Sequence, residues 1–259
     1  MSRYDFRTPR VYVEKPLAEG DEIVFGRGQA HYLLNVLRRN RGEAVLLFNG
    51  RDGEWRATLG GENRKVLAAR VGPRTRAQTP ATDLYFLFAP LKHARLDYLV
   101  QKAVEMGASR LQPVLTQHTQ ATRINLERAR ANVIEAAQQC GVLALPGVAE
   151  PVSLSTAVAD SQRLLVFCDE DAPVKDPLAA LGAAKPGTPL AVLIGPEGGF
   201  ASEERLLLLK RLNLVRLSLG PRILRADTAA VAALALVQAV LGDWIDEASR
   251  NPVTKLSPP

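Results

Sequence analysis

Two segments in the C-terminal half of the chain combine glycine, proline and charged residues in a way that suits small-ligand binding. They are residues 193–200 (LIGPEGGF) and residues 217–228 (LSLGPRILRADT). Each is a short apolar run that breaks into glycine and proline and then enters a helix-like stretch, which predicts a strand end followed by a tight loop. In an open α/β sheet, ligands bind beyond the carboxyl ends of strands, where glycine lets the backbone come close. The two loops therefore predict one shared site.

The composition of these loops favours an adenosyl group without a triphosphate. Phe200-Ala201-Ser202 stands where a phosphate-binding P-loop needs Lys-Ser/Thr, and His31 stands at the third glycine position of the dinucleotide-like Gly26-Arg27-Gly28. Backbone groups exposed by the loop glycines can hydrogen-bond an adenine edge, and leucine and isoleucine side chains can contact its faces. The residues in question are Gly195, Gly198, Gly199, Gly220, Leu217, Leu219, Ile223 and Leu224. The alternative is that both segments are ordinary Gly/Pro turns of an α/β fold.

The elements that must hold these loops alternate between strand and helix. Apolar runs predict strands at 84–88, 111–115, 164–168, 190–194 and 215–219, and helical spacing predicts helices at 95–106, 125–140, 202–212 and 228–247. This alternation predicts a mostly parallel sheet covered by helices. Ser202 before Glu203-Glu204 predicts the N-cap of its helix.

The N-terminal part has a different pattern. Short alternating segments at 22–25, 44–48, 54–59 and 66–71 are separated by turn signals and predict a small β-barrel, which a helix at 29–39 interrupts. Residues 72–80 have the composition of a linker. We therefore predict an α/β protein with a β-barrel domain at 1–72 and a larger domain at 80–259.

Charge and cysteine content narrow the functional class. The 259 residues carry 33 Lys+Arg against 27 Asp+Glu, a net charge of +6 that favours polyanionic partners. Two isolated cysteines and no N-terminal apolar segment predict a cytoplasmic protein. The three histidines have no ligand spacing, so we expect no metal site, and no apolar run approaches the roughly 20 residues that cross a bilayer.

The two loops, taken together, resemble a known family. They resemble the signature loops of the ribosomal RNA small subunit methyltransferase E family of the SPOUT superfamily, and the likeness covers nearly the whole chain. Residues 31–38 resemble the helix of that family's N-terminal PUA-like barrel, and Lys92 with residues 101–108 resembles the segment that leads into its methyltransferase domain. Two positions depart from the family pattern, Val142 and His118, where members often carry arginine.

The resemblance implies a PUA-like, RNA-binding barrel followed by a trefoil-knotted SPOUT methyltransferase domain that forms a homodimer. It implies S-adenosyl-L-methionine, bound in a bent form, as cofactor and N3 of a uridine in 16S ribosomal RNA of the small subunit as the methyl acceptor. The implied cofactor-binding residues are Leu193, Gly195, Pro196, Glu197, Gly198, Gly199, Leu217, Leu219, Gly220, Ile223, Leu224 and Thr228. The implied RNA-binding residues are Arg38, Arg39 and Arg222.

The reaction that the resemblance implies needs a group to remove or stabilise the N3 proton of uracil. Asp227 is our candidate for proton removal, directly or through water, and Arg225 for holding the uridine. A carboxylate that only stabilises the start of the last helix is the alternative for Asp227. For the whole chain, the alternatives are a noncatalytic RNA-binding assembly factor and a methyltransferase acting on another RNA position, such as a ribose 2′-hydroxyl.

Overall fold

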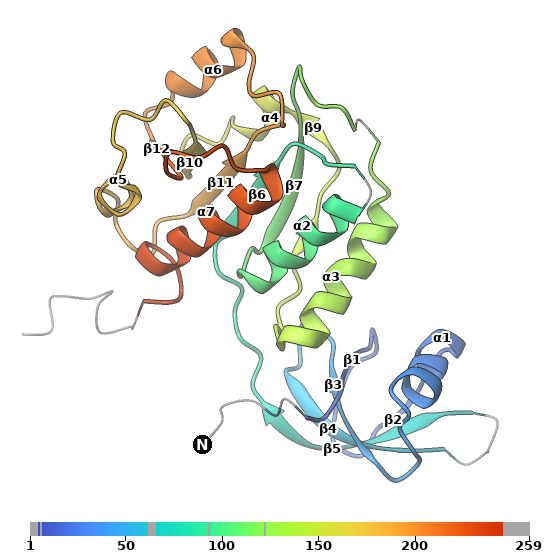
Figure 1. Cartoon of the computed structure of the whole chain (residues 1–259). Coiled ribbons are helices and arrows are strands. Elements are labelled where there is room, and N and C mark those ends of the chain that lie inside the picture. Colours follow the sequence, from blue (N-terminus) through green and yellow to red (C-terminus); the bar gives the residue numbers. More distant parts are fainter. Residues whose placement is uncertain (1–4, 6, 62–65, 93, 122, 246–259) are drawn as a thin grey trace, which may run out of the picture. The chain divides into compact units, whose positions relative to one another are not determined.

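The computed structural model describes residues 5, 7–61, 66–92, 94–121 and 123–245. The chain forms two compact units, residues 1–80 with 134–145 and residues 81–133 with 146–259 (Figure 1). We refer to them as the first and second units. The expected barrel segment 1–72 lies wholly in the first unit, which also takes in the end of a long helix. Within the described residues, no helix combines the length and apolar character needed to span a membrane.

The first unit is built on a five-stranded sheet in the order β1-β3-β4-β5-β2. The strands are β1 (Arg10–Tyr12), β2 (Glu22–Val24), β3 (Ala44–Phe48), β4 (Glu54–Gly60) and β5 (Ala68–Arg76). Only β1 and β3 run parallel; the other pairs are antiparallel, and the register between β4 and β5 shifts twice near Trp55. Such irregularities increase strand bending and twist. In the described part of the chain β1 and β2 do not pair with each other, so the sheet is a curled half-barrel rather than a closed one.

The helix predicted at 29–39 is shorter and less regular than its apolar spacing indicates. Helix α1 (Arg27–His31) continues as a single π-helical stretch, η1 (Tyr32–Val36), in which the Leu37 amide donates to the Tyr32 carbonyl at 2.9 Å. Leu33 is its one fully buried side chain and packs into the core of the sheet. The chain then leaves the helix at Arg38, whose φ of 52° is in the left-handed region that side chains rarely occupy.

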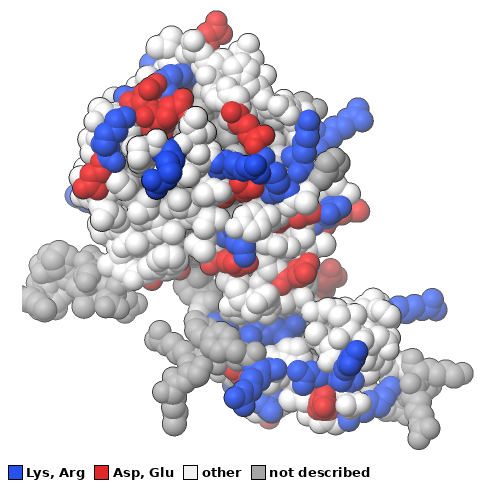
Figure 2. All heavy atoms as spheres, viewed as in Figure 1, with Lys and Arg blue, Asp and Glu red and all other residues white. Residues whose placement is uncertain are grey.

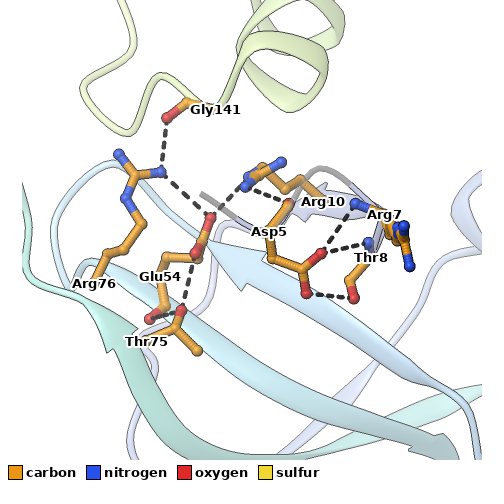
Figure 3. Close-up of polar contacts among 8 residues, drawn as sticks. All are labelled: Asp5, Arg7, Thr8, Arg10, Glu54, Thr75, Arg76 and Gly141. Carbon is orange, nitrogen blue, oxygen red and sulfur yellow. Dashed lines mark hydrogen bonds and ion pairs between the residues drawn. The ribbon is translucent and has the colours of Figure 1, made fainter. Parts of the chain in front are cut away.

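A buried carboxylate network organises one side of the first unit (Figure 3). Glu54 at the start of β4 accepts from Arg10 Nε at 2.8 Å and lies 3.5 Å from Arg76 Nη1; its side chain is 2% exposed. The Thr75 hydroxyl donates to the same carboxylate at 2.9 Å, and Arg76 also donates to the Gly141 carbonyl at 2.9 Å. The network therefore joins β1, β4, β5 and the turn after α3 through one buried charge.

The residues expected to form a linker are partly strand. Strand β5 continues through Arg76, because Arg74 and Arg76 still pair with Trp55 and Glu54 of β4. The linker predicted from Gly72 onward is therefore wrong for its first half, and only the residues after Arg76 connect β5 to the second unit. Side-chain polarity misled the prediction, since Arg74 of this strand is exposed and Arg76 pairs with the buried Glu54 carboxylate.

The second unit contains a parallel sheet in the order β12-β10-β11-β6-β7-β8, with β9 pairing with β7. Its main strands lie within two residues of the predicted positions, and the short β8 and β9 were not predicted. The bounds are β6 (Leu84–Phe88), β7 (Arg110–Leu115), β8 (Gly147–Val148), β9 (Val152–Ser153), β10 (Leu164–Cys168), β11 (Leu190–Ile194) and β12 (Leu214–Leu217). Among the described residues, every pair of neighbouring strands in this sheet is parallel, as the alternation of elements predicts.

Helices cover both faces of this sheet (Figure 1). They are α2 (Ala94–Glu105), α3 (Leu126–Cys140), α4 (Leu154–Ala157), α5 (Pro177–Gly182), α6 (Ser202–Leu209) and α7 (Ala226–Val240). Leu154 and Leu208 place α4 and α6 against one face, together with Leu165, Leu193 and other inward residues of the strands. Helix α7 packs on α2, α5 and β11, so the chain returns from the edge strand β12 toward the middle of the sheet. This burial on several sides explains why α7 is apolar around most of its circumference.

Candidate active site

The two glycine loops follow the carboxyl ends of two parallel strands in the second unit, so both lie at the same end of the strands. The first follows β11 and the second follows β12, and both strands pair in parallel with β10, which lies between them. Neighbouring strands lie about 4.8 Å apart, so the two strand ends are separated by about 10 Å. An adenosyl group placed over the end of β10 would have one loop on each side.

Arg95, in the first turn of α2, connects the two loops directly. Its Nε donates to Asp227 Oδ2 at 2.9 Å, and its Nη1 donates to Glu197. Glu197 belongs to the first loop and Asp227 to the beginning of α7, just after the second loop. One guanidinium thus holds a carboxylate from each side of the site. The remaining Arg95 nitrogen, Nη2, is buried and has no hydrogen-bond partner among the described residues.

This pairing changes what Asp227 can do chemically. The hydrogen bond from Arg95 holds the pKa of Asp227 below its ordinary value, and the Thr228 amide adds a further hydrogen bond at 2.9 Å. A carboxylate with a lowered pKa is a weaker proton acceptor. Arg225 is the N-cap of α7, which begins at Ala226, so Asp227 is the second residue of the helix. The geometry therefore favours the structural alternative for Asp227 over proton removal.

The first loop is fixed by close packing on both sides. A Cβ on Gly195 would lie 2.5 Å from the Phe200 ring, so only glycine lets this ring fold back under the loop. Phe200 in turn packs edge-on against Phe167 of β10, with ring centroids 5.3 Å apart. Glu204 accepts from the Ala201 amide at 3.0 Å, so α6 begins at Ser202 with Ala201 as N-cap. The prediction of Ser202 as N-cap is thus one residue too late.

The second loop mixes buried and exposed residues. Leu217 is fully buried and Ile223 fully exposed, so the side chain of Leu217 belongs to the core and only its backbone can face a ligand. Leu219 and Leu224 are half-buried, and Arg222, Arg225 and Thr228 are exposed. In the first loop Leu193 is likewise fully buried, whereas Glu197 and Gly198 are exposed.

A buried carboxylate stands at the end of β10, between the two loops. Asp169 is 3% exposed and pairs with Arg205 Nη1 at 2.8 Å and Arg216 Nε at 2.6 Å. Burial opposes its ionisation, but the hydrogen bonds from these arginines outweigh burial and keep the pKa of Asp169 below its ordinary value. Its neighbour Cys168 has a pKa raised to about 12 by burial and by the charge of Asp169. The two arginines thus hold Asp169 at the end of β10, and a thiol with so high a pKa is almost entirely in its unreactive protonated form near neutral pH.

The loop backbones fit an adenosyl cofactor. Gly199 and Gly220 have φ values of 72° and 93°, and the space where a Cβ would stand is open at both positions. Half-buried leucines border the second loop. Open backbone amides and carbonyls beside apolar side chains are the features that recognise an adenine edge and its faces.

Two of the predicted RNA-binding residues are in the other unit of the chain. Arg38 and Arg39 belong to the first unit, where Arg38 is exposed and Arg39 is half-buried, with its Nη1 3.9 Å from Glu43. Lys and Arg predominate on the face of the first unit seen in Figure 2. No group of metal-binding side chains exists among the described residues.

Three contributors to the site were not predicted from the sequence. Arg95 and Asp169 pair with residues far along the chain, and His118, after β7, contacts the first loop through Gly198 and Gly199. The sequence offered weak signals for two of them: Arg95 stands three residues after Lys92 at a helix start, and His118 stands where members of the family often carry arginine. Nothing in the local pattern distinguishes Asp169 from its acidic neighbours.

Comparison with known families matches both parts of the chain. Residues 25–71 match the family described as RNA methyltransferase PUA domain, and residues 78–238 match the family described as RNA methyltransferase domain. The second match covers more than half of the chain.

Individual relatives agree with these matches. The chain is 28% identical to ribosomal RNA small subunit methyltransferase E of Rickettsia conorii, over 92% of this chain and 98% of the relative. It is 31% identical to the protein of that name from Synechocystis, over 85% of this chain and 73% of the relative.

Solved structures extend the likeness to the fold. The chain is 28% identical to a putative methyltransferase from Legionella pneumophila solved with bound SAM, with a TM-score of 0.77 over 90% of this chain and 98% of the other. It is 25% identical to ribosomal RNA small subunit methyltransferase E from Neisseria gonorrhoeae bound to S-adenosyl methionine. The TM-score of this comparison is 0.75, over 92% of this chain and 100% of the other. The chain therefore belongs to the ribosomal RNA small subunit methyltransferase E family.

Proposed function

We propose that this protein transfers a methyl group from S-adenosyl-L-methionine to N3 of a specific uridine in 16S ribosomal RNA of the small ribosomal subunit. The observation that carries the proposal is the pair of glycine loops, on either side of β10, joined by Arg95 through Glu197 and Asp227. The names of the relatives and the S-adenosyl methionine in two similar structures support the choice of cofactor and RNA.

The second unit would hold the cofactor between its two loops. The backbones of Gly195, Gly199 and Gly220 would meet the adenine and ribose edges, and Leu219 and Leu224 would contact the adenine faces. When bound, the cofactor supplies an electrophilic methyl group on a sulfonium. The loops then orient this group toward the acceptor, and such positioning provides a large share of the acceleration in group-transfer reactions.

The first unit would bind the RNA backbone. Arg38 is exposed two residues after the end of the π-helical stretch, and Arg39 follows it. In the second unit, Arg222 and Arg225 are exposed and have no ion pair among the described residues, so both are available to phosphates or to the target nucleotide. Affinity that depends on such contacts falls steeply as salt rises.

We also propose that the enzyme acts as a homodimer in the cytoplasm, where ribosomes are assembled. Exposed apolar side chains in the second unit, including Leu206, Leu212 and Ile223, support an interface with another copy. Sedimentation at micromolar concentration should give twice the mass of the chain.

The reaction is tested by methyl transfer and nucleoside analysis. Small subunits lacking the modification are incubated with the protein and S-adenosyl-L-methionine carrying an isotope-labelled methyl group, and the RNA is digested for mass spectrometry. We expect label in 3-methyluridine at a single site. Label in a 2′-O-methyl nucleoside would show a different acceptor, and RNA binding without any label would show a noncatalytic binding protein.

A further inference from the structure

A second cavity adjoins the first glycine loop and is distinct from the space between the two loops. It has a volume of 250 Å³ and lies beyond the ends of three neighbouring strands, β11, β6 and β7. Its lining comes from the segments after these strands and from the first turn of α2: Pro90, Leu91, Lys92, Arg95, His118, Gln120, Pro196 and Glu197. Drug-sized ligands occupy about 300–1,000 Å³, so this volume suits a single nucleobase.

The position of the cavity matches the geometry of a transfer reaction. The adenosyl loops bracket the end of β10, whereas this cavity lies on the other side of the first loop, over the end of β6. The first loop is therefore shared, with Pro196 and Glu197 facing the cavity. A methyl donor and its acceptor must meet across one boundary, with the reacting atoms about 3–3.5 Å apart.

His118 is held in a defined orientation at the wall of this cavity. Its Nδ1 lies 3.0 Å from the Gly199 carbonyl oxygen and 3.2 Å from the Gly198 carbonyl oxygen. Carbonyl oxygens only accept hydrogen bonds, so Nδ1 carries the hydrogen, and in the neutral ring Nε2 is left with a lone pair. A Cβ on Gly198 would lie 3.3 Å from His118 Cβ, so glycine at this position lets the ring approach the loop.

The other charged side chains that line the cavity differ in whether they form ion pairs. Arg95 and Glu197 pair with each other, and Arg95 also pairs with Asp227. Lys92 is exposed, and no ion pair of its ammonium group occurs within the described residues. Lys92, Arg95 and Glu197 are the charged side chains that share the cavity with His118. Among the described lining side chains, His118 thus carries the one ring nitrogen with a free lone pair, since the Glu197 carboxylate is held by Arg95 and the amide oxygen of Gln120 is a much weaker base than an imidazole nitrogen.

We propose that this cavity receives the target uracil, that His118 Nε2 accepts the N3 proton, and that Lys92 stabilises the negative charge on the uracil oxygens. The proposal rests on the proposed function, which supplies the methyl donor. It concerns this chain, because an arginine at this position, which members of the family often carry, could stabilise the uracil anion but could not accept its proton. The N3–H bond breaks and its proton goes to His118; the N3 electron pair forms the new N–CH₃ bond. The sulfur–methyl bond breaks with its electrons left on sulfur, which becomes a neutral thioether, and His118 returns the proton to water.

The test compares two acceptors whose N3 protons differ in acidity. Small subunits are reconstituted on transcripts containing either uridine or 5-fluorouridine, because fluorine at C5 makes N3–H more acidic. General-base catalysis contributes about 10²–10⁴-fold. His118→Gln should therefore lower the single-turnover rate on uridine by at least about 100-fold. The loss of rate on 5-fluorouridine should be at least about tenfold smaller than the loss on uridine, because a more acidic acceptor depends less on the base. His31→Gln, which replaces a histidine of the first unit, is the matched control and should leave both rates unchanged.

Calorimetry with S-adenosylhomocysteine separates a chemical role from a structural one. We expect His118→Gln to bind this product with the affinity of the unaltered protein. Equal losses on both acceptors, a loss of less than about twofold on uridine, or weakened S-adenosylhomocysteine binding would each overturn the assignment of His118. Failure of the proposed function would look different, because the unaltered protein itself would then form no 3-methyluridine.

Discussion

Replacing Arg95 by methionine should weaken both the second unit and its cofactor site. Arg95 donates to Asp227 and to Glu197, which come from the two sides of the site. Methionine keeps much of the side-chain length and removes the charge and all of its donors. Glu197 and Asp227 would then both lose the cation that pairs with them.

The size of the effect follows from burial. The side chains of Arg95 and Asp227 are 30% and 17% exposed, whereas Glu197 is 50% exposed. A partly buried hydrogen bond between charged groups contributes about 1.5–3 kcal/mol, and an exposed pair adds little. The expected loss of stability is thus about 2 kcal/mol, which for a protein of this size corresponds to a Tm lower by about 4–8 °C. Loops that are no longer held together should also bind S-adenosylhomocysteine more weakly, with Kd rising about tenfold for each 1.4 kcal/mol of binding free energy lost.

Thermal melting and calorimetry measure the two effects. Arg128→Met is the matched control, because Arg128 pairs with Asp97 but is 64% exposed, and it should change neither quantity. A double-mutant cycle with Asp227→Asn should give a coupling energy of about 1 kcal/mol or more. If Arg95→Met melts and binds S-adenosylhomocysteine like the unaltered protein, then Arg95 does not join the two loops in solution.

Three further predictions concern buried charges and the thiol. Glu54→Gln should destabilise the first unit by about 3–5 kcal/mol in urea unfolding, since Arg10, 4% exposed, would lose its charged partner; an unchanged midpoint would refute this. Cys168, with a pKa of about 12, should be about one part in ten thousand thiolate at pH 8 and should resist iodoacetamide until the protein unfolds. The pKa of Asp169 is lowered by folding, so its contribution to stability is present above the ordinary carboxyl pKa of about 3.9 and is lost as pH falls through its folded pKa. Thermal melts of Asp169→Asn should therefore lack part of the fall in Tm seen below about pH 4 in the unaltered protein.

Much of the second unit could be predicted because its signals are local. The strands at 84–88, 164–168 and 190–194 are continuous apolar runs, and the structure has them at those residues. The first unit was harder, since β1 is only three residues long and pairs with β3. The π-helical stretch after α1 has the apolar spacing of an ordinary helix, so periodicity alone cannot reveal it.

The candidate site likewise contains some features that the sequence reveals and others that only the fold brings together. Its glycine loops are visible in the sequence because Gly and Pro interrupt apolar runs. Arg95 is not, because its partners lie 102 and 132 residues away and only the order of parallel strands brings them together. Likewise, the sequence left Asp227 open between proton removal and a structural role, and the hydrogen bond from Arg95, which no local pattern reveals, favours the structural role.

The proposed activity requires that the two glycine loops form one cofactor pocket. Calorimetric titration with S-adenosylhomocysteine should show one binding site per chain in the unaltered protein. Gly199→Val and Gly220→Val each place a branched side chain at a positive φ in one loop, and either change alone should abolish binding. Saturable binding that survives in one of these variants, or no binding to the unaltered protein at millimolar ligand, would contradict a shared pocket.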